Sequence, residues 1–252
     1  MAQPVQNSSM ARYVLSFFNT AQAPAAPAPP LMAPAPPLMS VRTQQPSTFL
    51  SAKKVCDEPG DIDELFNLHK SQHIHVVNLA SSDMRGMMWT YLMEHLDKLP
   101  ALITLNLTGC EIGRRPDITP TIFGEFMTGL KAMPFNLILR KCFINSKCIT
   151  PIAERLKVDR NLQTLDLAEN CLSSMDIQLI VDALGHNRTL SSLNLSHNKL
   201  DTASVPALAK LLTNTRSLEK LNLSANAFSA ADKATLEQAN AVRAGAPIEL
   251  ML

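Results

Sequence analysis

The chain has 252 residues, a formal net charge of +1 and a mean hydropathy of +0.03. This length allows one or two domains with a sizeable buried core. The near-neutral balance gives no reason to expect nucleic acid or acidic lipid as a partner, and no apolar run approaches the length of a membrane-spanning helix.

Residues 1–56 differ in composition from the rest of the chain. They contain no Asp or Glu, and nine of the 17 prolines lie within residues 1–46. The sequence APAPPLM occupies residues 26–32 and again residues 33–39. Proline fixes φ and removes backbone donors, so packing in such a segment does not offset its chain entropy. We expect a disordered leader that serves as a linker, as a ligand for a groove that reads polyproline, or as a delivery signal.

From residue 57 onward the composition is that of an ordinary domain, with 19 basic and 22 acidic residues. Residues 61–70 read DIDELFNLHK, with the apolar side chains near one helical face and acidic residues in the first turn. This pattern predicts an N-terminal capping helix over residues 61–70.

A repeat begins after this helix. Its template has apolar residues at positions i, i+3, i+5 and i+10, and Asn or Cys at position i+8. Six copies begin, in chain order, at Ile74, Leu102, Pro134, Leu162, Leu190 and Leu218. The steps are 28 residues except for one step of 32, between the second and third copies. A constant step with the same positions filled indicates a solenoid.

The chemistry of each template position predicts its place in the fold. Alternating apolar residues, as in Leu193-Asn-Leu195, predict a short strand with one buried face. Apolar spacing in the second half of each copy predicts a helix, for example over residues 176–184. The side chains at i+8 are expected to form one buried column, with reduced thiols, that satisfies backbone groups of the turns. Its members are Cys110, Cys142, Asn170, Asn198 and Asn226.

The motif LxxLxLxxNxL with a full helix in each 28-residue unit resembles the ribonuclease-inhibitor class of leucine-rich repeats, over roughly residues 72–252. The resemblance implies an α/β solenoid, a horseshoe arc with a parallel sheet on the concave side and helices outside, which functions by recognising another protein. The motif weakens at Ser82 and Pro134. The predicted domain therefore spans residues 57–252, and residues 248–252 are expected to add a closing strand.

The residues between the core leucines are expected to face the concave side. One such position, i+4, supplies a row of mostly small polar side chains that we predict to contact a partner. The row consists of Asn78, Asn106, Ile138, Asp166, Asn194 and Asn222. It contains none of the Trp, Tyr or Arg residues that usually dominate binding energy.

A second candidate site lies in the one long copy of the repeat. Its four extra residues are expected to form a rim loop, and Arg114 and Arg115 in that loop have the chemistry to bind a carboxylate or phosphate. The leucine-rich GTPase-activating protein for Ran resembles this chain by fold. The rim loop therefore provides an alternative hypothesis, in which the protein regulates a GTPase or another enzyme.

Neither catalysis nor cofactor binding is indicated. No nucleophile–base pair or phosphate-binding glycine loop is present, and the five cysteines lack zinc-site spacing. His69, His73 and His75 have no carboxylate or thiol at ligand spacing. Trp89 is expected to pack in the first repeat or to contact a partner. We predict a monomer that binds a protein, with no enzyme activity, no metal and no cofactor.

An acid-free leader followed by a eukaryotic-looking repeat resembles type III secreted effectors of bacteria. That resemblance implies export into the cytoplasm of a host cell, and without it a cytoplasmic location is expected. A mitochondrial transit peptide is the rival interpretation, although residues 1–50 contain only Arg12 and Arg42 as basic residues.

Overall fold

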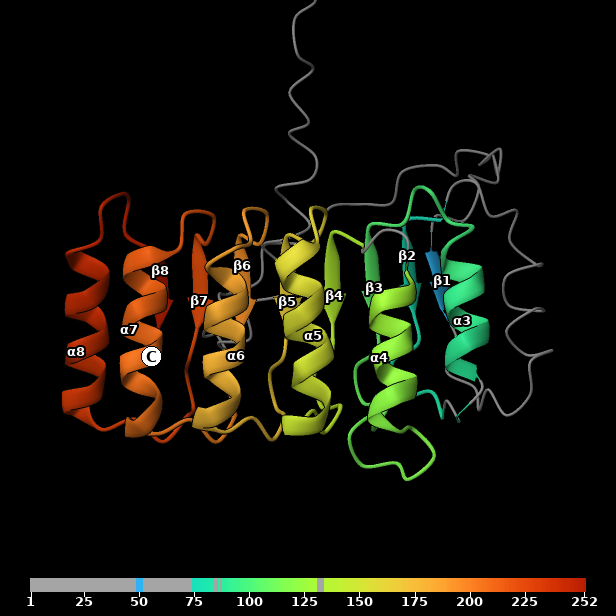
Figure 1. Ribbon diagram of the computed structural model, residues 1–252, viewed down its shortest axis with the longest axis horizontal. Helices are drawn as coiled ribbons and strands as arrows, with labels where there is room; N and C mark the ends of the chain where they lie inside the picture. Colours follow the sequence, from blue (N-terminus) through green and yellow to red (C-terminus); the bar gives the residue numbers. More distant parts are fainter. Residues whose placement is uncertain (1–48, 52–73, 84–85, 87, 131–133) are drawn as a thin grey trace, which may run out of the picture. The chain divides into compact units, whose positions relative to one another are not determined.

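The computed structural model describes residues 49–51, 74–83, 86, 88–130 and 134–252. The strands of this part form one parallel sheet whose order follows the chain (Figure 1). They are β1 (Phe49–Ser51), β2 (Val76–Asn78), β3 (Thr104–Asn106), β4 (Asn136–Ile138), β5 (Thr164–Asp166), β6 (Ser192–Asn194), β7 (Lys220–Asn222) and β8 (Glu249–Met251).

Each described helix lies on the same face of the sheet (Figure 1). The helices are α3 (Met88–Leu96), α4 (Pro120–Gly129), α5 (Ser146–Val158), α6 (Ser174–Leu184), α7 (Val205–Asn214) and α8 (Ala230–Ala241), with the short 3-10 turn η3 (Thr202–Ser204) before α7. The opposite face of the sheet carries none of these helices, and we call it the open face. It corresponds to the side that the repeat pattern predicts to be concave.

The core lies between the sheet and the helices, and the repeat pattern explains it. The apolar residues at i+3 of successive copies are paired in register along the sheet, for example Leu165 with Leu193 and Leu193 with Leu221. These three side chains are fully buried. Each helix adds one apolar stripe, such as Ile177, Ile180 and Leu184 of α6. Every repeat thus buries its apolar face against its neighbours.

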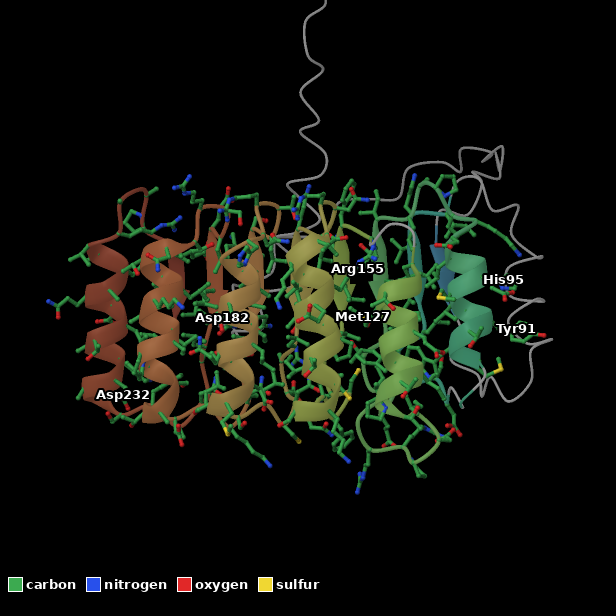
Figure 2. The ribbon with its side chains drawn as sticks, in the orientation of Figure 1. Tyr91, His95, Met127, Arg155, Asp182 and Asp232 are labelled. Carbon is green, nitrogen blue, oxygen red and sulfur yellow. The ribbon has the colours of Figure 1, made fainter. Side chains whose placement is uncertain are left out.

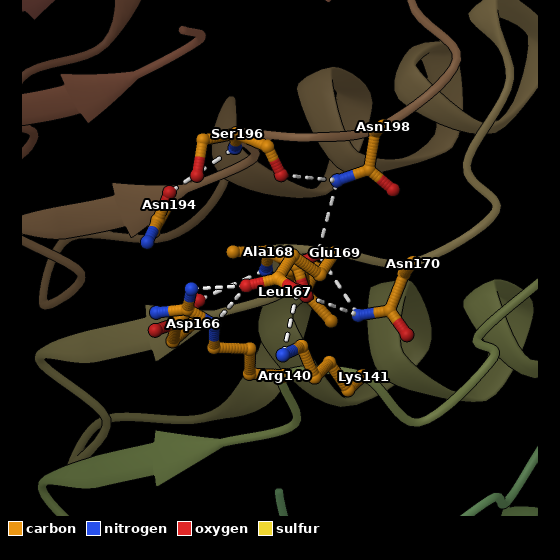
Figure 3. Close-up of polar contacts among 10 residues, drawn as sticks. All are labelled: Arg140, Lys141, Asp166, Leu167, Ala168, Glu169, Asn170, Asn194, Ser196 and Asn198. Atoms are coloured by element: carbon orange, nitrogen blue, oxygen red, sulfur yellow. Dashed lines mark hydrogen bonds and ion pairs between the residues drawn. The ribbon is translucent and has the colours of Figure 1, made fainter. Parts of the chain in front are cut away.

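The predicted column at i+8 is present, with Cys110, Cys142 and Asn170 buried and Asn198 and Asn226 half-buried. Asn198 donates to the carbonyl oxygen of Ser196 in its own repeat, at 3.2 Å, and to that of Leu167 in the preceding repeat, at 3.0 Å (Figure 3). It also donates to the carbonyl oxygen of Leu195, at 3.0 Å. Its Oδ1 accepts from the N–H of Leu172. One amide therefore satisfies backbone groups of two neighbouring repeats, which would otherwise lose hydrogen bonds on burial.

Cysteine fills only half of this role. Cys110 Sγ donates to the carbonyl of Leu79, and Cys142 Sγ donates to that of Leu107, at 3.1 and 2.9 Å. A thiol offers no amide oxygen, and the residue after each cysteine, Glu111 or Phe143, has a positive φ. Both cysteines are thiols, as are Cys148 and Cys171. Burial raises the pKa of Cys142 well above its ordinary value, so this thiol stays protonated.

Three expectations for the ends of the domain have different outcomes. The closing strand is confirmed as β8, over Glu249–Met251. The placement of residues 49–51 in the leader is wrong, because they form β1 and pair in parallel with β2. This strand was not predicted because Phe49–Ser51 precedes the first recognisable copy of the repeat. The predicted helix over residues 61–70 and residues 1–48 lie outside the described residues.

Candidate binding surface

The row of predicted contact residues is assembled as expected, with one member on each strand from β2 to β7. Adjacent members are register partners, so their side chains stand next to one another across the sheet. Ile138 and Asn194 are buried, and the other four members are half-buried. The register confirms that these residues share one row, while their contact with a partner stays a prediction.

The polar members of this row also terminate the strands. Asn194 Oδ1 accepts a hydrogen bond from Ser196 N at 3.1 Å, and Asp166 Oδ1 accepts one from Ala168 N at 2.9 Å (Figure 3). Asn78, Asn106 and Asn222 accept the equivalent bond. Short polar side chains that bond their own backbone two residues on favour turns, so the choice of residue is explained locally. These side chains have a structural role in addition to any role in binding.

Asp166 is the only charged member of the row. Burial raises the pKa of its carboxyl above the ordinary value, against the effects of the Ala168 N–H, the Arg140 charge and a hydrogen bond from Asn194, which lower it. A carboxyl with a raised pKa is one that its surroundings have partly desolvated. A partner that donates a hydrogen bond to Asp166 would relieve part of this cost.

A cluster of charged side chains lies beside Asp166, where β4 and β5 end (Figure 3). We call Arg140, Lys141 and Glu169 the ionic cluster. Glu169 accepts a hydrogen bond from Arg140 Nε at 2.6 Å, is also contacted by Arg140 Nη2, and forms an ion pair with Lys141 Nζ at 3.0 Å. Burial raises the pKa of Glu169, but the bonds from Lys141 and Arg140 outweigh that effect and hold this pKa below its ordinary value.

The ionic cluster was not predicted from the sequence. Its members stand at i+6 and i+7 of the third and fourth copies, beyond the strand position i+4 from which the row of contact residues was predicted. Position i+7 has a shared backbone feature, because in every copy its residue has a positive φ. The residues are Ser81, Gly109, Lys141, Glu169, His197 and Ala225, with φ between 53° and 75°. We call them the left-handed row.

The rim loop is anchored to its neighbours more firmly than its sequence suggests. The loop extends past the neighbouring connections below α4 (Figure 1). Arg115 forms an ion pair with Asp83, and the exposed Arg114 guanidinium lies 5.0 Å from the centroid of the Phe143 ring. Gly113 lies so close to the next repeat that an added Cβ would be 1.9 Å from the carbonyl oxygen of Phe143. Arg115 is thus engaged within the chain, and Arg114 remains the more accessible of the two arginines.

Three further features concern Trp89, metal binding and membrane crossing. Trp89 is fully buried and contacts Phe123 and Phe126 edge-on, so it belongs to the core rather than to a partner surface. Among the described residues, no group of three or more His, Cys, Asp or Glu side chains is arranged to hold a metal ion. His69 and His73 lie outside these residues. In the described part of the chain, no helix has the length and hydrophobicity that a bilayer crossing requires.

One family model and two solved structures are similar to parts of this chain. A family model described as "Leucine Rich repeat" matches residues 186–209. The solved structure of leiomodin-1 actin-binding site 2 is similar at 19% identity and a TM-score of 0.42, covering 75% of this chain and 88% of that chain. The tropomodulin C-terminal domain from Caenorhabditis elegans is similar at 11% identity and a TM-score of 0.43, covering 71% and 90%. A search of curated proteins finds no match. The parallel sheet, the one-sided helices and the repeats identify the described domain as a leucine-rich-repeat solenoid.

Proposed function

We propose that this protein is a binding scaffold without enzyme activity, and that a protein partner docks on the open face around the ionic cluster. One observation carries the proposal. The described helices all cover one face of the sheet, and the open face carries the in-register row of i+4 side chains, with the ionic cluster beside it where β4 and β5 end. Protein recognition is also the function that the resemblance to ribonuclease-inhibitor-type repeats implies.

The ionic cluster offers a test because its basic residues can be removed without changing the backbone. The residue at i+6 is alanine in the fourth copy (Ala168), and the residue at i+7 is alanine in the sixth copy (Ala225). We therefore expect the double variant Arg140→Ala/Lys141→Ala to fold with a free energy of unfolding within about 1 kcal/mol of the native value. We expect it to bind the partner at least tenfold more weakly, which corresponds to about 1.4 kcal/mol.

A partner protein is first captured with the full chain as bait. The affinity of that partner for the native chain and for each variant is then measured by isothermal titration calorimetry. The matched control is Lys157→Ala/Lys210→Ala, which removes two positive charges from the helix side. There Lys210 Nζ lies 3.3 Å from Asp182, which Figure 2 labels on α6. The control should bind normally. Equal losses of affinity in both double variants, or no loss in either, would show that the partner does not dock on the open face. If the full chain captures no protein, the proposal of a binding scaffold is rejected.

The rim loop supplies the rival interpretation, in which Arg114 acts on a GTPase or another enzyme. Its exposed guanidinium is the observation in favour. The same calorimetric comparison decides between the two surfaces. If Arg114→Ala weakens binding and the Arg140→Ala/Lys141→Ala variant does not, the rim loop is the contact site.

We further propose that the leader delivers the domain, as in type III secreted effectors. The supporting observation is compositional: residues 1–56 lack acidic residues and are rich in Pro and Ala. Residues 1–48, which stop short of β1, can be fused to a reporter and expressed in a secretion-competent bacterium and in its secretion mutant. Export from the competent strain alone is expected. Equal export from both strains, or none from either, would leave the leader as a linker and the protein in the cytoplasm.

A further inference from the structure

The connections that lead from each helix into the next strand contain a second repeating position. They lie at the opposite ends of the helices from the rim loop (Figure 1). Asp159, Asn187 and Thr215 are spaced by 28 residues and occupy this position after α5, α6 and α7. Asp159 and Thr215 have the same backbone conformation, with φ −67° and ψ 144° for Asp159 and φ −67° and ψ 141° for Thr215. In both, the N–H donates to the carbonyl four residues earlier, at 2.9 Å.

In the first two connections the side chain at this position accepts two backbone hydrogen bonds. Asp159 Oδ2 accepts from the N–H groups two and three residues on, at 2.9 and 2.6 Å. Asn187 Oδ1 accepts from the equivalent pair at 2.9 and 2.8 Å. Asn240, in the last turn of α8, reaches the following connection, where its Oδ1 accepts from the N–H of Ile248 at 2.9 Å. An oxygen of a carboxylate or amide therefore closes each of these connections.

The connection after α7 lacks that oxygen. Thr215 is only 4% exposed, and its Oγ1 has no hydrogen-bond partner within the described structure. The N–H groups of Ser217 and Leu218, which correspond to the capped pair, likewise make no hydrogen bond to a described residue. Leu218 is 1% exposed, so its N–H is shielded from bulk water. Buried donors rarely remain unpaired in folded proteins.

The residues that carry these three donors, Thr215, Ser217 and Leu218, are among those that line a pocket of about 660 Å³. Arg243 lines the pocket and donates to the carbonyl oxygens of Thr215 and Leu218, at 2.9 and 3.2 Å, which places a positive charge beside the uncapped peptide groups. The exposed Arg216 lines the pocket as well, and Glu219 is the single acidic residue of the lining. The lining thus combines two arginines, one carboxylate and unpaired N–H and O–H donors.

We propose that this pocket binds an oxyanion, a carboxylate or a phosphate, presented by a protein partner. One oxygen takes the place that Asp159 Oδ2 and Asn187 Oδ1 occupy in the preceding repeats. It accepts from the N–H groups of Ser217 and Leu218, and the Thr215 hydroxyl donates to the same group. Successive backbone N–H groups form anion-binding sites of this kind, and hydrogen bonds to an ionised acceptor are stronger than neutral ones. The site is separate from the open face, so this proposal is tested independently of the proposed docking there.

The test uses inorganic phosphate and acetate as separate probes of the full chain. Nuclear magnetic resonance of the backbone amides reports on each N–H group directly. We expect saturable shifts at Ser217 and Leu218 that weaken as the ionic strength rises. Saturation with phosphate alone assigns the site to a phosphorylated partner, and saturation with both probes assigns it to a carboxylate as well. Unchanged amide resonances up to high probe concentration would mean that water alone fills the site, and would overturn the proposal.

A substitution that fills the site provides the second readout. Thr215→Asn introduces the amide found in the preceding repeat, on a backbone that already has the required conformation. We expect its unfolding midpoint in anion-free buffer to rise by about 2–4 °C, and the saturable amide shifts to disappear. Thr235→Asn, at an exposed position of α8 outside the pocket lining, is the matched control and should retain the shifts. Arg216→Gln should weaken the binding of both phosphate and acetate while leaving the unfolding midpoint unchanged. Persistent binding in Thr215→Asn would refute the assignment of these donors.

Discussion

At the scale of single residues, one side chain often has two duties in this fold. The four asparagines at i+4 close the turns after their own strands and also lie in the row on the open face. Asp166 has the same place, but it brings a charge that its surroundings disfavour. The four asparagines of the row show that a neutral amide satisfies the turn equally well. Asp166 therefore costs stability that asparagine would not.

The substitution Asp166→Asn tests this reasoning. The amide oxygen still accepts from Ala168 N, so only the charge is lost. Because the pKa of Asp166 is raised in the folded state, the native chain binds more protons than the unfolded chain between the ordinary value of 3.8 and the folded-state pKa. Native stability therefore falls as the pH rises through that window, and stays lowered above it.

We expect Asp166→Asn to be more stable than the native protein at neutral pH and equal to it below the ordinary pKa of the carboxyl. Urea denaturation at a series of pH values measures the difference. The matched control Glu169→Gln should behave in the opposite way, since the pKa of Glu169 is lowered and its charge stabilises the folded state above that pKa. A neutral-pH loss of stability in Asp166→Asn would show that the Arg140 charge outweighs burial.

The column at i+8 and the row at i+4 could be predicted at this scale because each follows from the period of the repeat. Arg140, Lys141 and Glu169 could not, because ion pairs between repeats depend on how side chains of different copies meet rather than on a position within one copy. Thr215 illustrates the same limit. Its missing acceptor becomes visible only when its backbone is compared with that of Asp159.

At the scale of elements, the connections differ more than the strands and helices do. Each strand has three residues, whereas the connection between β3 and α4 contains the additional residues of the long copy. That connection is held by Gly113, whose N–H donates to the carbonyl of Cys142 and whose carbonyl accepts from Asn145 Nδ2, at 2.9 and 3.0 Å. The close approach of these two backbones fixes the loop, and glycine permits it.

We expect Gly113→Ala to lower the free energy of unfolding by about 1–3 kcal/mol, since the new Cβ forces two backbone segments apart. Gly124→Ala is the matched control. The added Cβ there has Pro151 Cβ at 3.8 Å as its nearest neighbour, and alanine favours the helix α4 by about 0.5–1 kcal/mol. Chemical denaturation of both variants should therefore give changes of opposite sign. Two changes of the same sign would show that the rim loop moves aside at little cost.

At the scale of the whole molecule, the sheet order repeats the order of the chain, and α4 to α8 contact one another in succession. The solenoid, its helices and its closing strand were predictable for this reason, because each copy needs only its neighbours to complete its core. The strand β1 was not predictable, since Phe49–Ser51 pairs with β2 without any copy of the motif around it. Stacking geometry, and not sequence similarity, brings this strand into the sheet.

The left-handed row has a consequence for how this protein can change over time. Glycine would adopt these turns freely, whereas every other residue accepts a cost of about 1–2 kcal/mol. Five of the six positions nevertheless carry a side chain, of five different kinds: hydroxyl, ammonium, carboxylate, imidazole and methyl. The φ angles of these five residues lie between 53° and 59°. Mutation can therefore exchange one chemical group for another along this row, while the turns, the sheet and the core remain as they are.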